Sequence, residues 1–130
     1  MYSKQTNGLV VSVTPEFLEE HSRPDEGRFV WAYHITIVNE GSQRVQLLNR
    51  YWKIIDAQGR TQEVRGAGVV GEQPVLDPGQ EFSYTSGCPL ETSSGVMMGS
   101  YEMVAEDGSH FDISIPAFSL DSPLGNMAVN

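Results

Sequence analysis

The sequence predicts an all-β fold: an immunoglobulin-like or fibronectin type III-like antiparallel β-sandwich of about seven strands. Three observations lead to this prediction. Several segments alternate apolar and polar residues, turn-forming residues separate these segments at the spacing typical of all-β domains, and almost no segment has helical periodicity. The 130 residues match the usual size of one domain, which can bury a core unaided.

Three strands are predicted in the N-terminal part of the chain. The first covers 9–14 and can continue past Pro15 after a bulge, and because proline cannot donate to a ladder we expect an edge strand. The turn residues of 39–42 predict a hairpin between the second strand, 28–39, and the third, 45–56. One face of the second strand is predicted to enter the core, and it consists of Phe29, Trp31, Tyr33, Ile35 and Ile37.

Four more strands are predicted around a long loop. A tight turn at 56–59 leads to a strand at 61–65, and residues 66–79 contain four glycines and two prolines, which predict irregular structure. Asp107 and Gly108 predict a type I′ hairpin, because both tolerate the positive φ that this turn needs. The last three strands are expected at 81–86, 97–105 and 111–118.

The domain is expected to cover 8–120. Residues 1–7 are predicted to be a flexible N-terminus and 121–130 a flexible C-terminal tail, because both ends have little apolar content. We find no internal repeat and no second domain.

Composition excludes several classes of function. Eight Lys plus Arg residues against seventeen Asp plus Glu give a formal charge of −9, which repels a phosphate backbone and argues against nucleic-acid binding. Apolar runs are much shorter than the roughly 20 residues that cross a bilayer, so no membrane insertion is expected. The single cysteine, Cys88, and the absence of a secretory signal at the start favour the cytoplasm.

Residues 66–71 match the G-x-G-x-x-G pattern of dinucleotide-binding folds. Pro74 and Pro78 follow, however, and exclude the helix whose N-terminus would meet a pyrophosphate. The loop can still form an anion-binding nest of backbone amides, or its glycines can be purely conformational. The candidate residues for binding a ligand or partner are Gly66, Gly68, Val69, Val70, Gly71 and Gln73.

Other reactive side chains favour structural roles. Cys88 lacks a recognisable histidine base and an electropositive surrounding, and His34 is expected to be packed or hydrogen-bonded. The acidic residues of 19–26 offer oxygen ligands but lack the spacing of a calcium loop, so we predict no metal site and no cofactor. Trp31 and Trp52 are expected in the core rather than at an interface.

Most of the chain resembles the ApaG family. The resemblance rests on the segments FVWAYHITIVNEG, EVRGAGVVGEQP, LDPGQEFSYTSG, GVMMGSYEM and IPAFSL. It implies a fibronectin type III-like sandwich, a genetic link to cobalt and magnesium tolerance or efflux, and a gene often found near a diadenosine-tetraphosphate hydrolase. Related eukaryotic domains, in F-box proteins and a DNA-polymerase-interacting protein, resemble protein-binding modules, and no enzyme activity is implied.

Two functions follow as hypotheses. The first is a non-enzymatic protein-interaction module, because the sequence combines a rigid scaffold, a long glycine-rich loop and open sheet edges with no catalytic constellation. The alternative is a small-ligand binder that takes a nucleotide pyrophosphate or a divalent cation through the glycine-rich loop or the acidic loop. An enzyme is the least favoured class, and the oligomeric state stays open.

Overall fold

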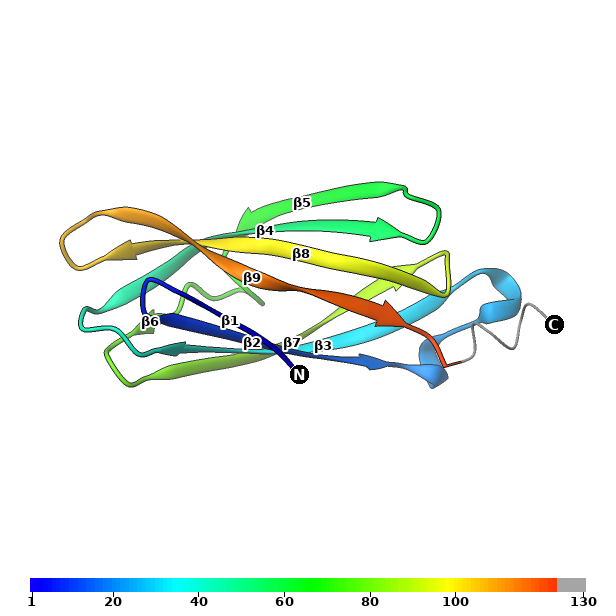
Figure 1. Cartoon of the computed structure of the whole chain (residues 1–130), viewed down its shortest axis with the longest axis horizontal. Coiled ribbons are helices and arrows are strands. Elements are labelled where there is room, and N and C mark those ends of the chain that lie inside the picture. Colours follow the sequence, from blue (N-terminus) through cyan, green and yellow to red (C-terminus); the bar gives the residue numbers. More distant parts are fainter. Residues whose placement is uncertain (124–130) are drawn as a thin grey trace.

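The computed structural model describes residues 1–123, which form nine strands and two 3-10 turns (Figure 1). The turns are η1 (Glu19–His21) and η2 (Pro24–Glu26). The strands are β1 (Tyr2–Thr6), β2 (Leu9–Phe17), β3 (Phe29–Asn39), β4 (Val45–Asp56), β5 (Thr61–Ala67), β6 (Val75–Leu76), β7 (Glu81–Leu90), β8 (Ser94–Ala105) and β9 (His110–Asp121). Asp121 ends the last strand, and the rest of the predicted tail lies almost wholly outside the described residues.

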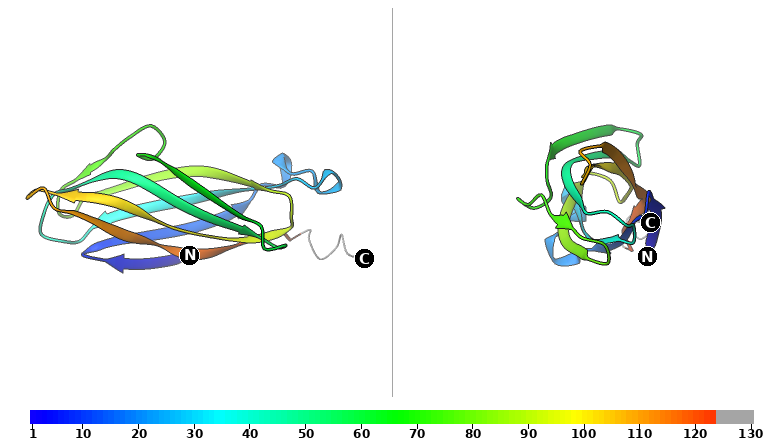
Figure 2. Two further views of the ribbon diagram at one scale, coloured as in Figure 1. Left: turned by 90° about the horizontal axis from the view of Figure 1, so that it is seen from above. Right: turned by 90° about the vertical axis from the view of Figure 1, so that its left-hand side faces the viewer.

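The strands form two antiparallel sheets. One has the order β1-β2-β3-β7, and the other has the order β5-β4-β8-β9, with β6 added to β4. Viewed from one end, the sheets wrap around a single interior (Figure 2). The predicted β-sandwich is therefore confirmed, and β1 and β6 raise the number of strands in residues 1–123 above the expected seven.

The core is built from the inward faces of both sheets. All five predicted core residues of β3 are buried, and Trp31 and Trp52 are 1% and 3% exposed. Trp31 also donates from its indole N–H to the backbone oxygen of Asp121 at 3.1 Å. Alternation of apolar and polar residues thus identified the buried face of β3 correctly.

The N-terminal segment 1–7 is not the flexible end that its composition predicted. It forms β1, which pairs with β2 through a tight turn in which Asn7 and Gly8 both have positive φ. The prediction that the first predicted strand, 9–14, is an edge strand is also wrong, because it belongs to β2, which lies between β1 and β3. Pro15 is tolerated because β1 pairs with β2 only as far as Val13, so at Pro15 the strand has β3 alone beside it.

The connection from β3 to β4 crosses between sheets, which corrects the predicted hairpin. Asn39 explains the crossing. Its fully buried side chain donates to the backbone oxygens of Gln43 (2.8 Å) and Leu76 (2.9 Å) and accepts from the amide of Gly41 (2.9 Å). These bonds hold the turning chain together, so the turn residues redirect the backbone instead of folding it back.

The β8–β9 hairpin forms as predicted, but its turn type differs. Gly108 has φ +84°, whereas Asp107 is not among the residues with positive φ, so the turn is not type I′. Asp107 instead accepts hydrogen bonds from the amide and hydroxyl of Ser109. An Asp side chain that bonds two residues ahead stabilises the turn without a left-handed backbone.

The two sides of the sandwich differ. On one side, β9 packs against β1 and β2, with the rings of Tyr2 and Phe118 6.1 Å apart and the Ser114 amide bonded to the Thr6 hydroxyl. On the other side, β5 and β7 make no comparable contact, and each is paired along one edge only. The sandwich is therefore closed at β1 and β9 and open between β5 and β7.

Candidate functional site

The glycine-rich candidate residues belong partly to a strand and partly to a loop. Gly66 lies in β5 opposite Arg50 of β4, so the strand continues beyond its predicted end at residue 65. Gly68 follows β5, and its amide donates to the backbone oxygen of Leu48 at 2.8 Å. The loop between β5 and β6, residues 68–74, is called the glycine loop below.

A tight reverse turn forms the tip of the glycine loop. Val69 and Glu72 exchange two backbone hydrogen bonds of 2.8 and 2.9 Å, and Val70 and Gly71 between them have φ of +44° and +81°. Positive φ at both central positions is the type I′ pattern, for which a β-branched residue is poorly suited. Val70 is nevertheless there, and it is 56% exposed.

Three of the six backbone amides of the glycine loop are already bonded within the protein. Those of Gly68, Val69 and Glu72 donate to backbone carbonyls, so they do not converge on an anion. Gly68 and Gly71 are instead required for the local conformation of the loop. A Cβ on Gly68 would meet the carbonyl oxygen of Glu72 at 2.3 Å, whereas Gly71 has open space around it and is needed for its positive φ.

The glycine loop is anchored firmly to β4. The side-chain amide of Gln73 donates to the backbone oxygen of Leu48 at 2.9 Å, and Gln46 donates to the backbone oxygen of Gln73 at 3.1 Å. The amide of Leu47 donates to Pro74. Gln73 therefore acts as a support for the loop, and the exposed tip at Val70 is held on a fixed base.

Arg50 connects β4 to the start of the glycine loop. Residues Arg50, Trp52 and Ile54 follow a bulge in β4 and share the inward face of their sheet. The Arg50 guanidinium lies over Gly66, where a Cβ would come within 2.8 Å of Nη1, and it donates to the backbone oxygens of Ala67 (3.1 Å) and Gly68 (3.0 Å). Gly66 is therefore the residue that makes room for this side chain.

Arg50 has no acidic partner among residues 1–123. The ion pairs of that part of the chain join other residues, such as Arg44 with Asp77 and Arg60 with Asp56. Arg50 is only partly exposed, in a protein of formal charge −9. An arginine that points inward without a carboxylate is unusual, since buried charges are normally paired.

A cavity of about 260 Å³ lies at the open side of the sandwich beside Arg50. Its inner wall is largely apolar and aromatic, and β5 and β7 form its two rims. It also receives polar groups from Arg50, Tyr33 and Ser86. The lining residues are Tyr33, Arg50, Trp52, Ile54, Gln62, Val64, Ser86, Gly87, Cys88, Pro89 and Met97.

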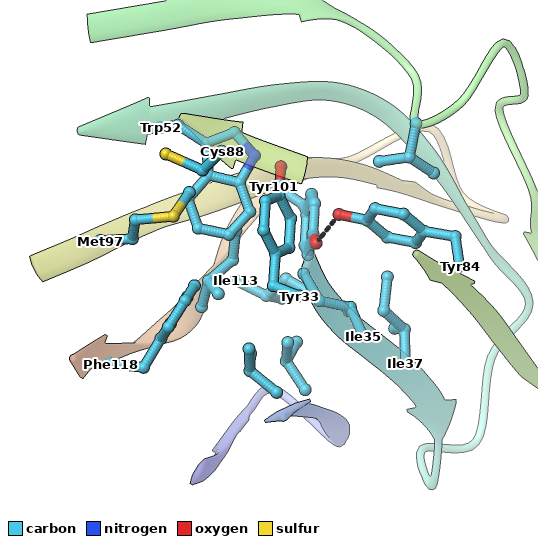
Figure 3. Packing of buried hydrophobic residues seen from close by; sticks show 14 of the residues in the cluster. Tyr33, Ile35, Ile37, Trp52, Tyr84, Cys88, Met97, Tyr101, Ile113 and Phe118 are labelled. Atoms are coloured by element: carbon cyan, nitrogen blue, oxygen red, sulfur yellow. Dashed lines mark hydrogen bonds between the residues drawn. The ribbon is translucent and has the colours of Figure 1, made fainter. Parts of the chain in front are cut away.

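Three tyrosines lie at the inner end of this region (Figure 3). Tyr84 and Tyr101 are hydrogen-bonded through their hydroxyl groups, while the hydroxyl of Tyr33 points away from this pair toward Trp52 and Cys88. Burial raises the pKa of all three phenols above the usual range. The phenols are thus neutral hydrogen-bonding groups at physiological pH.

The remaining reactive candidates have structural surroundings. Cys88 is buried, and burial raises the pKa of its thiol to about 11, which opposes formation of a nucleophilic thiolate. His34 is hydrogen-bonded, as predicted, to Thr85 and Glu16 on the outer face of its sheet. In residues 1–123 no group of three or more His, Cys, Asp and Glu side chains is arranged to hold a metal.

Two larger and shallower depressions lie elsewhere on the surface. One, of about 850 Å³, is lined by Arg60, Asp56 and Glu91, which already pair with one another. The other, of about 760 Å³, includes Arg50 and Gly66 but also Glu102, which bonds to Asn49. The cavity of about 260 Å³ is therefore the more distinctive site, because its arginine has no acidic partner among residues 1–123.

None of the helical segments in the described part of the chain has the length and apolar character needed to cross a membrane.

The fold and site define a small β-sandwich domain that presents an anchored loop and an open sheet edge. The sequence model of the ApaG domain matches residues 19–105. Curated ApaG proteins from Brucella canis and Rhodospirillum centenum are each 60% identical to it over 130 residues, covering all of both chains. A crystal structure of an ApaA protein from Bordetella pertussis has a TM-score of 0.87 and 50% identity, covering 88% of this chain and 94% of the other. The chain belongs to the ApaG family.

Sequence reasoning missed Arg50, although a signal was present. Arg50 has the same parity as Trp52 and Ile54, so strict alternation places it on the buried face. Parity counted from Val45 and Leu47 gives the opposite answer, because the β4–β8 register shifts between Leu47 and Asn49. A β-bulge of this kind reverses which side chains enter the core.

Proposed function

We propose that this ApaG-family protein is a non-enzymatic protein-interaction module whose contact surface includes the tip of the glycine loop. The observation that carries the proposal is the conformation of Val70. A valine with positive φ costs about 1–3 kcal/mol of strain, which the surrounding structure must hold in place. Because the Val70 side chain is exposed, packing within the protein does not offset this strain. Contact with another molecule would account for a valine at this position.

The surroundings of Val70 suit a protein partner. Val70 and Val75 are the exposed large apolar side chains of residues 1–123 apart from Met1 and Tyr2 at the N-terminus. Gln73 and Leu47 hold the backbone of the glycine loop to β4, so little conformational entropy is lost on binding. An apolar residue on a rigid loop is the kind of anchor that protein interfaces use.

The geometry gives less support to a nucleotide pyrophosphate or a divalent cation at the glycine loop. The amides of Gly68, Val69 and Glu72 are bonded to backbone oxygens, and the loop tip carries an apolar side chain. We propose that the cobalt and magnesium tolerance implied by the family resemblance acts through the partner protein. Calorimetry with diadenosine tetraphosphate, Mg²⁺ and Co²⁺ is expected to show no specific heat of binding.

A capture experiment from an extract of the native host tests the proposal. The Val70→Asn variant removes the apolar side chain and suits positive φ, so it should fold at least as well and lose its partner. Val70→Ile keeps a β-branched apolar side chain and should retain the partner. Equal capture of a stoichiometric partner by both variants would exclude the loop tip as the contact, and the absence of any such partner would refute the proposal.

A further inference from the structure

The outer edge of β7 is unusually open for pairing. Within residues 1–123, β7 is bonded to β3 on one side and to no strand on the other. Residues 82–90 carry no charge, and Pro89 is the single proline among them. Natural proteins usually protect a long edge with charges, prolines or bulges, as β5 does with Glu63 and Arg65. In β7 such residues stand only near the two ends, at Glu81 and Pro89, so the edge at 82–88 between them lacks this protection.

The register shows which backbone groups are available. The amide of Asn39 donates to the oxygen of Gln80, the residue opposite it, so the even-numbered residues of β7 bond toward β3. In an antiparallel strand the alternate residues point the other way. The backbone groups of Ser83, Thr85 and Gly87 therefore face the open edge, and Pro89, which has no N–H, fits the same pattern.

The cavity beside Arg50 lies directly inside this edge. Ser86 and Cys88 of β7 line it together with Gln62 and Val64 of β5. Its volume of about 260 Å³ falls below the roughly 300–1,000 Å³ of sites that enclose a whole small ligand. A space of this size between two sheet edges suits one or two side chains of an extended peptide better than an independent ligand.

Charge decides the chemistry of the side chain that enters. Arg50 reaches the cavity with two of its donor bonds directed to carbonyls and none to a carboxylate of residues 1–123. Tyr33 and Ser86 add hydroxyl groups nearby. A carboxylate would pair with the guanidinium and accept bonds from the hydroxyls, whereas a cation would be repelled.

We propose that the outer edge of β7 binds an extended segment of a partner protein as an added strand, and that this segment places one Asp or Glu side chain in the cavity beside Arg50. Backbone bonds to Ser83, Thr85 and Gly87 supply affinity, and the acidic side chain supplies selectivity. The inference rests on the proposed role in protein interaction, but it concerns a surface other than the glycine loop.

A peptide selection tests the inference with the intact chain. A phage library of random 12-residue peptides is selected on the immobilised protein, and the best peptide is synthesised for fluorescence polarisation. The selected sequences should share one acidic residue in an extended, alternating context. Replacing that residue by its amide should weaken binding about tenfold or more, since bonds to charged groups are among the strongest.

Matched variants locate the bound peptide. Thr85→Pro removes an outward N–H and should weaken binding by more than about tenfold, because a ladder bond is lost and the proline ring obstructs the edge. Thr85→Val removes the same hydroxyl, which bonds to His34, but keeps the N–H and should bind almost normally. Thermal unfolding of both variants identifies any loss of fold.

In Arg50→Gln, the acidic peptide and its amide should bind alike, which a merely structural role for Arg50 would not produce.

Hydrogen exchange separates this inference from the proposed function. Bound peptide should protect the amides of Ser83, Thr85 and Gly87. Protection at Val70 and Gly71 with an unprotected β7 edge would overturn the inference and leave the glycine loop as the binding surface. The inference also fails if no peptide is enriched or if the peptide binds equally well without its carboxylate. It fails as well if a small carboxylate probe, phenylacetate, binds in the cavity and no peptide does. If the peptide binds at β7 and the Val70→Asn variant still captures the natural partner, only the proposed role of the loop tip is refuted.

Discussion

Each glycine of the G-x-G-x-x-G pattern is required for a different reason, so changing them one at a time to alanine is expected to separate one large loss of stability from two smaller ones. Gly68→Ala is expected to be the most harmful. Its φ of +64° disfavours any Cβ by about 1–2 kcal/mol, and the new methyl group would lie 2.3 Å from the Glu72 oxygen. Relieving that clash breaks the two Val69–Glu72 backbone bonds, each worth about 1 kcal/mol. The expected loss of stability is about 3–4 kcal/mol.

The other two substitutions provide reference values for the loss of stability. Gly71→Ala meets no atom within 4 Å and should cost about 1 kcal/mol for its φ of +81° alone. Gly66→Ala has no φ penalty, and its methyl group meets the far end of the flexible Arg50 side chain at 2.8 Å. Moving that side chain sacrifices its bonds to two carbonyls, at a cost of about 1–2 kcal/mol.

Urea unfolding of the wild type and the three variants measures these costs as changes in midpoint at constant slope. The decisive comparison is Gly68→Ala against Gly71→Ala, because both have positive φ and only the first clashes with the backbone. Equal losses in these two variants would refute the steric reasoning. Negligible losses in all three would show that the glycines are not conformational, and would return attention to ligand binding.

Three further predictions concern other features of the fold. Val70→Asn should raise stability by about 1 kcal/mol because Asn tolerates positive φ, so a lower melting temperature would contradict the assignment of strain to Val70. Asn39→Ala removes three hydrogen bonds from a fully buried site and should cost about 3 kcal/mol in denaturant unfolding, and a loss below about 1 kcal/mol would argue against its role in the crossing. Burial raises the pKa of Cys88 from about 9 to about 11, so the folded state keeps a proton that the unfolded state releases. Stability present below pH 9 should therefore fall by about 2–3 kcal/mol as the pH rises to 11, and Cys88→Ala should reduce the slope between pH 9 and 10, before the phenols titrate.

The fold could be predicted from sequence because alternation and turn residues are local signals. Trp31 and its neighbours on β3 alternate cleanly, and their buried face was identified without a structure. The β1–β2 hairpin was missed although Asn7-Gly8 is itself a strong hairpin signal. The apolar pattern begins only at Leu9, so the polar β1, whose role is to cover an edge, resembled a flexible terminus.

The connection at Asn39 shows what local signals cannot decide. The same turn residues suit a hairpin and a crossing between sheets, and the choice depends on bonds from Asn39 to Gln43 and Leu76. Leu76 is far along the chain, so no window of sequence around the turn contains this information. The candidate site had the same difficulty, since the bulge near Leu47 decides whether Arg50 faces the core.

Arg50 also links the two surfaces, which yields a prediction about binding. Its guanidinium lies over Gly66 and supports the carbonyls where the glycine loop begins, while the same side chain reaches the cavity inside β7. Gly66→Ala must displace this guanidinium, whereas Gly71→Ala leaves it untouched. Fluorescence polarisation should therefore show an acidic peptide binding about tenfold more weakly to Gly66→Ala and normally to Gly71→Ala, although the two variants have similar stability. Equal affinities would mean that the bound carboxylate does not meet Arg50, because stability alone cannot distinguish these two substitutions.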